Sequence, residues 1–163
     1  MEFLGSAEVS MNICADRTWP SVAMVVEVYK RALFELKSRN VKFRAITDVT
    51  RDNVKHCKEL IKYAELRHLD GIKGNFGVSD KAYTASATLQ EATLLQQVIY
   101  SNVKAILEQQ HYVFETLWNK AISAEGKIKE LEQGLEPDII EVIRDPPTTT
   151  NLYLDLIRKA ANV

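Results

Sequence analysis

The sequence predicts an α/β fold in which helices pack on a mixed β-sheet. Stretches of alternating apolar residues at 10–15 and 41–47 are each followed by a segment with apolar residues at helical spacing. A glycine-punctuated region then leads to two adjoining strand-like stretches and a long helical segment. This order is typical of an α/β sandwich whose sheet contains parallel and antiparallel strands.

The first half of the chain predicts three helices that alternate with strands. We expect helices at 2–9, 21–40 and 50–64, and strands or extended segments at 10–15, 41–47 and 66–69. Ser21 and Thr50 are suited to cap the second and third helices. Asn40 is suited to end the second helix in a left-handed conformation.

The second half predicts a hairpin followed by a long helix. Gly71, Gly74 and Gly77 exclude a helix before the hairpin. Its expected strands are 75–79 and 82–89, and the long helix is expected over 92–122, which contains neither glycine nor proline. A shorter helical piece is expected at 127–132.

Two units are predicted along the chain: a domain at 1–134, and a linker with the start of a second, truncated repeat at 135–163. After Pro137 a strand is expected at 139–143 and a helix after 148–150. The apolar spacing of 156–163 matches that of 3–9, which precedes the first predicted strand. An unrelated closing helix is the alternative interpretation of 156–163.

Composition and charge exclude several classes of protein. The chain has 163 residues, 46% hydrophobic and 26% charged, which excludes a disordered or low-complexity chain. Its 21 basic and 22 acidic residues give a net charge of −1, so we expect neither a nucleic-acid nor a membrane partner. Neither a signal peptide nor a membrane span is apparent, and two cysteines indicate no disulfide framework. We therefore expect a cytoplasmic protein.

The sequence lacks the motifs of common cofactor and metal sites. Neither glycine-rich nucleotide signature occurs, and the stretch from Gly71 to Gly77 has the spacing of neither. The three histidines lack the spacing of a helical zinc site, and no Cys-x-x-Cys is present. We predict no cofactor and no metal.

A candidate ligand site lies around 66–80, where polar groups of opposite sign stand beside glycines. Polar residues at the ends of the first two strands are expected nearby, because ligands of open α/β sheets bind at strand ends. The predicted ligand-binding residues are Arg67, His68, Lys73, Asn75, Arg44, Thr47, Cys14 and Asp16. The basic character of the loop weakly indicates an anionic small molecule. A solvated loop with local charge pairs is the alternative.

The stretch from Lys73 to Asp80 resembles the motif of phospholipase D-type hydrolases, which is His-x-Lys-x-x-x-x-Asp. Only Asp80 matches, because Lys73 stands in place of the histidine and Asn75 in place of the lysine. A lysine cannot replace a histidine that titrates near neutral pH. The resemblance thus implies a phospholipase D-like half-domain without hydrolase activity.

Five segments resemble, in order, the sensory input region of archaeal histidine kinases, across nearly all of 10–134. They are ICADRTWPSV, FRAITDVTRDNVKHCKELIK, LRHLDGIKGNFGVSD, IYSNVKAILEQQ and FETLWNKAI. More distantly, the chain is similar to the phospholipase D-like effector domain of TrmB-type archaeal sugar-sensing regulators. The kinase core is expected outside this chain, because neither its His-Glu-x-x-x-Pro box nor its Asp-x-Gly-x-Gly motif occurs.

The resemblance implies a ligand-binding sensor module of an archaeal two-component histidine kinase, which is not itself an enzyme. The first alternative is an effector-binding or dimerisation domain of an archaeal transcriptional regulator. Two further alternatives are a residual phosphodiesterase and a purely structural dimerisation unit. Because phospholipase D-type units commonly pair, a homodimer or pairing with a second like domain is expected.

Overall fold

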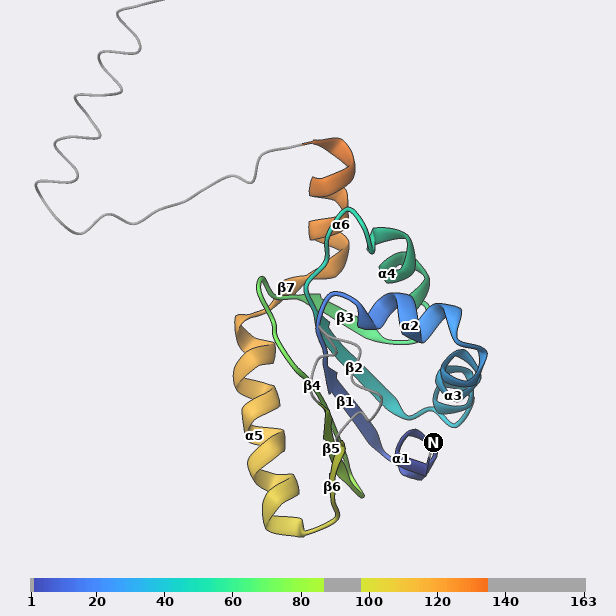
Figure 1. The fold of residues 1–163 in the computed structure, drawn as a ribbon, viewed down its shortest axis with the longest axis vertical. Helices are drawn as coiled ribbons and strands as arrows, with labels where there is room; N and C mark the ends of the chain where they lie inside the picture. Colours follow the sequence, from blue (N-terminus) through green and yellow to red (C-terminus); the bar gives the residue numbers. More distant parts are fainter. Residues whose placement is uncertain (1, 87–97, 135–163) are drawn as a thin grey trace, which may run out of the picture.

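The computed structural model describes residues 2–86 and 98–134, which form a central sheet between two helical layers (Figure 1). The seven strands lie in the order β6-β5-β4-β1-β2-β3-β7. The strands are β1 (Ser10–Cys14), β2 (Lys42–Thr47), β3 (Glu65–His68), β4 (Asn75–Ser79), β5 (Tyr83–Ser86), β6 (Val98–Ser101) and β7 (Ile122–Ser123). The helices are α1 (Glu2–Ser6), α2 (Trp19–Val25), α3 (Glu27–Ser38), α4 (Val54–Leu60), α5 (Lys104–Lys120) and α6 (Ala124–Gln133).

The centre of the sheet is parallel and its margins are antiparallel. β1, β2 and β3 pair in parallel, whereas β4 pairs antiparallel with β1 and β7 antiparallel with β3. β1 and β2 are buried along most of their length, as expected for strands covered on both faces. The mixed α/β fold predicted from the sequence is therefore confirmed.

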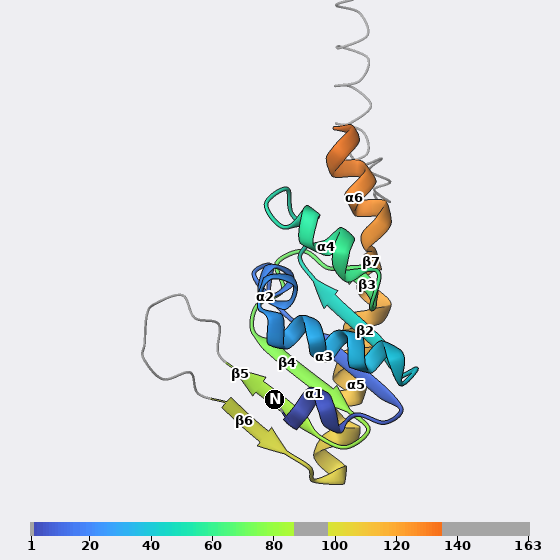
Figure 2. The same cartoon turned by 90° about the vertical axis from the view of Figure 1, so that its right-hand side faces the viewer.

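Two separate apolar cores lie on the two faces of the sheet. On one face α1, α2, α3, α4 and α6 pack against residues such as Met11, Phe43 and Leu66. On the other face α5 runs behind the strands in the view of Figure 2. Its residues Phe114 and Trp118 cover Ile46 and Val78. α5 is thus the principal cover of its face in the described part of the chain.

The predicted helix at 21–40 is in fact two helices. Val26 has an extended backbone (φ −81°, ψ 111°) and separates α2 from α3. Val25, Val26 and Val28 are β-branched, which lowers helix propensity at this point. The break allows α2 to bury Ala23 and Met24 while α3 buries another set of residues. Asn40 has the predicted left-handed conformation (φ 56°).

The long helix predicted over 92–122 is shorter than expected. Residues 98–101 form β6, and α5 begins only at Lys104. Val98, Ile99 and Tyr100 favour a strand, and sequence periodicity alone does not separate a short apolar strand from a helix. Residues 92–97 lie outside the described part.

Two smaller expectations also differ from the structure. The cap position of α4 is Asn53 rather than Thr50, because the helix begins only at Val54. The chain after α5 contributes β7, which was not predicted. The expected strand at 139–143 and helix after 148–150 lie outside the described residues, so the repeat at 135–163 stays a prediction.

Candidate functional site

The carboxyl ends of β1 and β2 meet Asn75 at the start of β4 and form a closed polar cluster. The Asp16 backbone N–H donates to Asn75 Oδ1 (3.1 Å), and Asn75 Nδ2 donates to Asp16 Oδ2 (3.0 Å). Thr18 donates to Asp16 Oδ1 through its backbone N–H and its hydroxyl group. Thr47 Oγ1 donates to the Asp16 carbonyl oxygen (2.9 Å). Both oxygens of the Asp16 carboxylate therefore accept hydrogen bonds from the protein itself, and the residue is 6% exposed.

The connection between β3 and β4, residues 69–74, runs along this carboxyl edge. β3 ends at this edge, and β4, which is antiparallel to β1, begins at it. Because β1 and β2 lie between β3 and β4 in the sheet, the connection must pass the ends of both strands. The Leu69 N–H donates to the Thr47 carbonyl oxygen (3.0 Å). Gly71 and Gly74 have positive φ angles of 67° and 83°, which other residues rarely adopt. The edge where ligands of α/β sheets usually bind is thus crossed by the chain.

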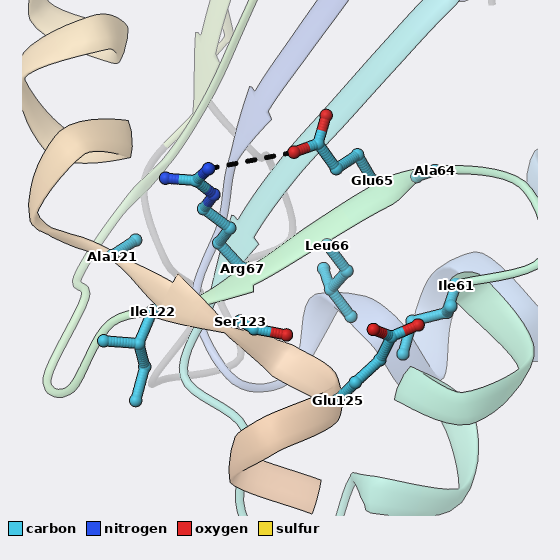
Figure 3. A pocket seen from close by; sticks show the side chains of 9 residues that line it. All are labelled: Ile61, Ala64, Glu65, Leu66, Arg67, Ala121, Ile122, Ser123 and Glu125. Atoms are coloured by element: carbon cyan, nitrogen blue, oxygen red, sulfur yellow. Dashed lines mark ion pairs between the residues drawn. The ribbon is translucent and has the colours of Figure 1, made fainter.

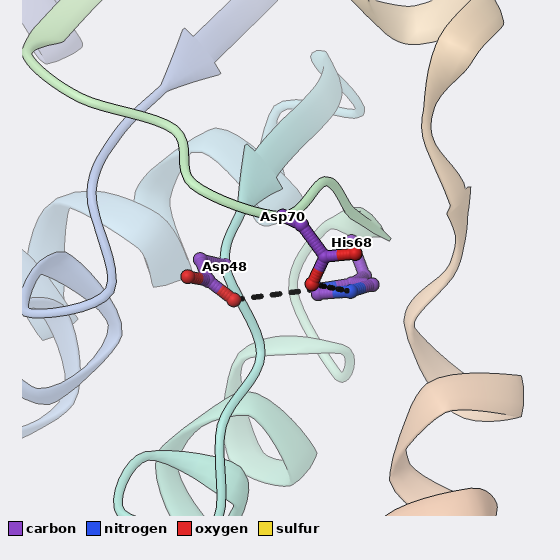
Figure 4. Close-up of side chains that lie close together, drawn as sticks. All are labelled: Asp48, His68 and Asp70. Carbon is purple, nitrogen blue, oxygen red and sulfur yellow. Dashed lines mark ion pairs between the residues drawn. The ribbon is translucent and has the colours of Figure 1, made fainter. Parts of the chain in front are cut away.

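His68 joins β3 to the loop before α4. The Val49 N–H donates to His68 Nδ1 (2.9 Å), so Nε2 of the neutral ring carries the proton and donates to Asp70 Oδ1 (3.1 Å; Figure 4). Asp48 Oδ1 lies 3.8 Å from Nδ1. The three side chains could in principle hold a metal ion. Both ring nitrogens are already engaged, however, which fits a histidine that fixes a loop rather than a metal ligand.

Arg44 and Arg67 lie on the α5 face of the sheet against Trp118. The guanidinium carbon of Arg44 is 5.0 Å from the centres of the Phe114 and Trp118 rings. That of Arg67 is 4.3 Å from the Trp118 ring, and Arg67 Nη1 donates to the Trp118 carbonyl oxygen (2.9 Å). Arg44 also forms an ion pair with Glu115. The hydrogen bond from Arg44 holds the pKa of Glu115 below its ordinary value, although desolvation acts the other way.

A cavity of about 640 Å³ lies at the open margin of the sheet beside β3 and β7 (Figure 3). β7 pairs only with Arg67 and His68, so Glu65 and Leu66 have no β7 partner. Arg67 and Glu65 lie on one side of β3, and their charged groups are 3.9 Å apart. Leu66 and Glu125 lie on the other side. The lining residues are Ile61, Ala64, Glu65, Leu66, Arg67, Ala121, Ile122, Ser123 and Glu125.

The structure distributes the eight predicted ligand-binding residues over several places. Asp16, Thr47 and Asn75 share the closed cluster, and His68 adjoins it. Arg44 and Cys14 lie under α5, where burial raises the pKa of the Cys14 thiol to about 12. Only Arg67 lines the cavity, and Lys73 is exposed.

Sequence reasoning missed the cavity residues after α5. Ile122 and Ser123 belong to a two-residue strand, which is too short to produce an alternating pattern. The sequence did offer one signal, because Ser123 followed by Glu125 suits the start of a helix. In the structure Ser123 precedes α6 and accepts a hydrogen bond from the Gly126 N–H, and Glu125 lies in the first turn. That signal places a helix start, but not a cavity.

Comparison with known proteins gives a fold neighbour. No family model and no curated protein matches the chain. Among solved structures, the chain is similar to TrmBL2, an archaeal chromatin protein described as showing a novel mode of DNA binding. The TM-score is 0.55 at 18% identity, covering 76% of this chain. The match covers 48% of the TrmBL2 chain, so this chain spans about half the length of that neighbour.

This comparison corrects two predictions. The prediction of a sensor module of a two-component histidine kinase is wrong, because the fold is shared with an archaeal chromatin protein. The exclusion of nucleic acid as a partner is also contradicted, because that neighbour is described by its DNA binding. The alternative, a domain of an archaeal transcriptional regulator, agrees better with the comparison. For membranes, no helix of the described residues is long and apolar enough to span a bilayer.

Proposed function

We propose that this chain forms a regulatory domain of an archaeal DNA-binding protein of the TrmB type and binds a small effector beside Arg67. The observation that carries the proposal is the fold shared with TrmBL2 over 76% of the chain. We also place the fold among phospholipase D-like sandwiches, on the resemblance of 73–80 to the hydrolase motif. At 18% identity the comparison concerns fold, so the activity rests on the experiments below.

The proposed domain is not a hydrolase. Asp80, which alone matches the phospholipase D motif, uses Oδ1 to accept the backbone N–H groups of Glu8, Val9 and Ser10 at 3.1–3.2 Å. Lys73 and Asn75 replace the histidine and lysine of the motif, and Asn75 is bonded to Asp16. Asp80 and Asn75 therefore make structural hydrogen bonds, and the position of the nucleophilic histidine is held by the exposed Lys73.

The cavity beside Arg67 suits an effector better than the carboxyl edge does. The polar groups of the Asp16 cluster already bond to one another. By contrast, the Arg67 guanidinium group is 3.9 Å from the Glu65 carboxylate, which is a long distance for an ion pair. The cavity volume is within the range of small-molecule sites, and apolar and polar groups both line it. An anionic group could pair with Arg67. The other predicted ligand residues stay predictions.

A ligand in this cavity would contact the part of the chain that follows α5. Ala121, Ile122 and Ser123 line the cavity, and Arg67 holds the carbonyl oxygen of Trp118 near the end of α5. A ligand that binds one placement of α5 more tightly than another shifts the population toward it. We propose that this shift carries the regulatory signal.

Two measurements test the two halves of the proposal. Chromatin immunoprecipitation of this protein from its own cells is expected to recover DNA, and no enrichment over a mock antibody would contradict DNA association. Native mass spectrometry of gently purified protein is expected to show a small-molecule adduct. Arg67→Ala should remove the adduct, while Arg51→Ala, a control at an exposed arginine outside the cavity, should keep it. An adduct that survives Arg67→Ala places the effector elsewhere.

A further inference from the structure

A chain of polar contacts attaches α5 to three strands of the sheet. Arg44 Nε donates to Asn12 Oδ1 (2.9 Å), and Asn12 Nδ2 contacts His111 Nδ1 (3.3 Å). On the other side of the imidazole, His111 Nε2 contacts the Ser79 carbonyl oxygen (3.2 Å). Asn12 is 1% exposed, so water does not readily replace its partners. This polar chain joins β2, β1, α5 and β4 in turn.

The contacts allow one arrangement of hydrogens. Arg44 can only donate, so the Asn12 oxygen must face it and the Asn12 amide NH₂ must face His111. Nδ1 of His111 must then accept. Because the Ser79 carbonyl oxygen can only accept, Nε2 of His111 must carry the ring proton. The polar chain is complete only with a neutral imidazole.

We propose that His111 is a proton-sensitive latch that holds α5 on the sheet. Protonation places a second N–H on Nδ1, which then faces the amide NH₂ of Asn12 with no acceptor between them. Turning the Asn12 amide does not help, since its NH₂ would then face the N–H of Arg44. The protonated ring must therefore leave its place, and the hold on α5 weakens. This inference does not depend on the effector proposed above.

The charged groups around His111 act in both directions, since the Glu115 carboxylate, one turn along α5, attracts a protonated ring. The other ionisable side chains of α5 are Lys104, Glu108, Tyr112, Glu115 and Lys120, and those of β1, β2 and β5 are Cys14, Lys42, Arg44 and Tyr83. Arg44 already engages the Glu115 carboxylate, and its hydrogen bond lowers the pKa of that group. Burial raises the pKa values of Cys14 and Tyr83, so both stay neutral. Lys42 and Arg44 repel a further positive charge.

The sign of the effect follows from the neutral ring. Protonation of Nδ1 in place sets its new N–H against the amide NH₂ of Asn12, so the complete attachment of α5 requires the neutral ring. We therefore expect the attachment to weaken as the pH falls through the range in which histidine side chains generally take up a proton. His68 also accepts an N–H at Nδ1, but it lies between β3 and the loop before α4. A measurement local to α5 separates the two histidines.

Amide hydrogen exchange of the whole chain, resolved by peptide and corrected for intrinsic rates, tests the latch. Between about pH 8 and pH 5.5 we expect the protection of α5 to fall about tenfold, the effect of one lost buried hydrogen bond. His111→Gln, whose amide can accept from Asn12 and donate to Ser79, should remove this pH dependence. His56→Gln, a matched control on α4, should retain it.

Asn12→Asp gives an independent readout with the opposite sign. Its carboxylate accepts from both Arg44 and a protonated His111, so α5 should be better protected at the lower pH. Either of two results would overturn the latch. One is a wild-type chain in which the protection of α5 does not change with pH, even if the protection of the segments around His68 does. The other is a fall in protection that His111→Gln retains. If Asn12→Asp does not fold, the His111→Gln comparison decides alone.

Discussion

Asp80 shows how one carboxylate fixes the start of the chain on the sheet. Its Oδ1 accepts the N–H groups of Glu8 and Val9, which lie between α1 and β1, and of Ser10, the first residue of β1. Partial burial by itself raises the pKa of Asp80, but the backbone donors outweigh it and the net pKa is lowered. The charged form is therefore favoured by folding.

Replacing Asp80 by asparagine should lower the free energy of unfolding by about 1–2 kcal/mol near pH 7, since a charged acceptor of three N–H groups becomes neutral. The pKa of Asp80 is lower in the folded than in the unfolded chain, so its contribution is present above about pH 4 and lost as the pH falls further. Urea titrations at several pH values measure this. Asp52→Asn, at an exposed position, should change little. Equal losses for both variants would contradict the role of Asp80.

At the scale of elements, α1 contacts β4 where Phe3 lies close to Gly77. A Cβ on Gly77 would lie 2.8 Å from Cε1 and 3.0 Å from Cζ of Phe3, closer than such atoms approach. Phe3 packs against the core of the helix-covered face, and α1 also buries Leu4 there. The missing side chain of Gly77 therefore makes room for the ring that anchors α1.

Gly77→Ala should destabilise the protein by about 1–2 kcal/mol, because the Phe3 ring must move. Gly5→Ala in α1 meets no atom within 4 Å and should be neutral or stabilising by up to about 1 kcal/mol. Thermal denaturation with a double-mutant cycle provides the check. Phe3→Leu should remove most of the cost of Gly77→Ala, and additive effects of the two substitutions would exclude the proposed contact.

The sequence predicted the elements with strong periodicity and missed those set by tertiary contacts. β1, β2 and the segment forming β4 were located because their apolar residues alternate or follow glycines. The break at Val26 and the strand β6 were missed, since β-branched residues there fitted a helical pattern as well. β7 has two residues and exists only because β3 offers an edge to pair with.

At the scale of the whole molecule, one helix covers most of a sheet face. Phe114 is fully buried and stacks on Trp118, with ring centres 5.6 Å apart, and both lie over β1, β2 and β4 residues. Tyr112, two residues away on the same helix, is 74% exposed. The two sides of α5 therefore differ sharply in what they contribute to stability.

Phe114→Ala should lower the free energy of unfolding by about 3–5 kcal/mol, through lost burial and the cavity left behind. Tyr112→Ala, the control on the outer side of α5, should cost less than about 0.5 kcal/mol. Guanidinium titrations followed by circular dichroism measure both. A loss below about 1 kcal/mol for Phe114→Ala would show that α5 is not the cover described.

The site could be predicted only where its residues are close to strand ends. Asp16 and Thr47 were selected for that reason and Asn75 from the glycine-rich stretch, and the structure brings the three together, though bonded to each other. Arg67 was selected from the loop region, but part of the lining of its cavity, including Ser123 and Glu125, comes from more than fifty positions later. No local pattern links such distant segments, because they are joined by tertiary contacts such as the pairing of β3 with β7.

The position of α5 late in the chain has a consequence for synthesis on the ribosome. β1, β2 and β3 are complete at His68, yet Phe114 and Trp118, which cover Ile46, follow some fifty residues later. At about 5–20 residues per second, the apolar face waits roughly 3–10 s for its cover. A nascent chain of this length presents that face to water and to other chains. Chaperones that act during translation would meet this protein there.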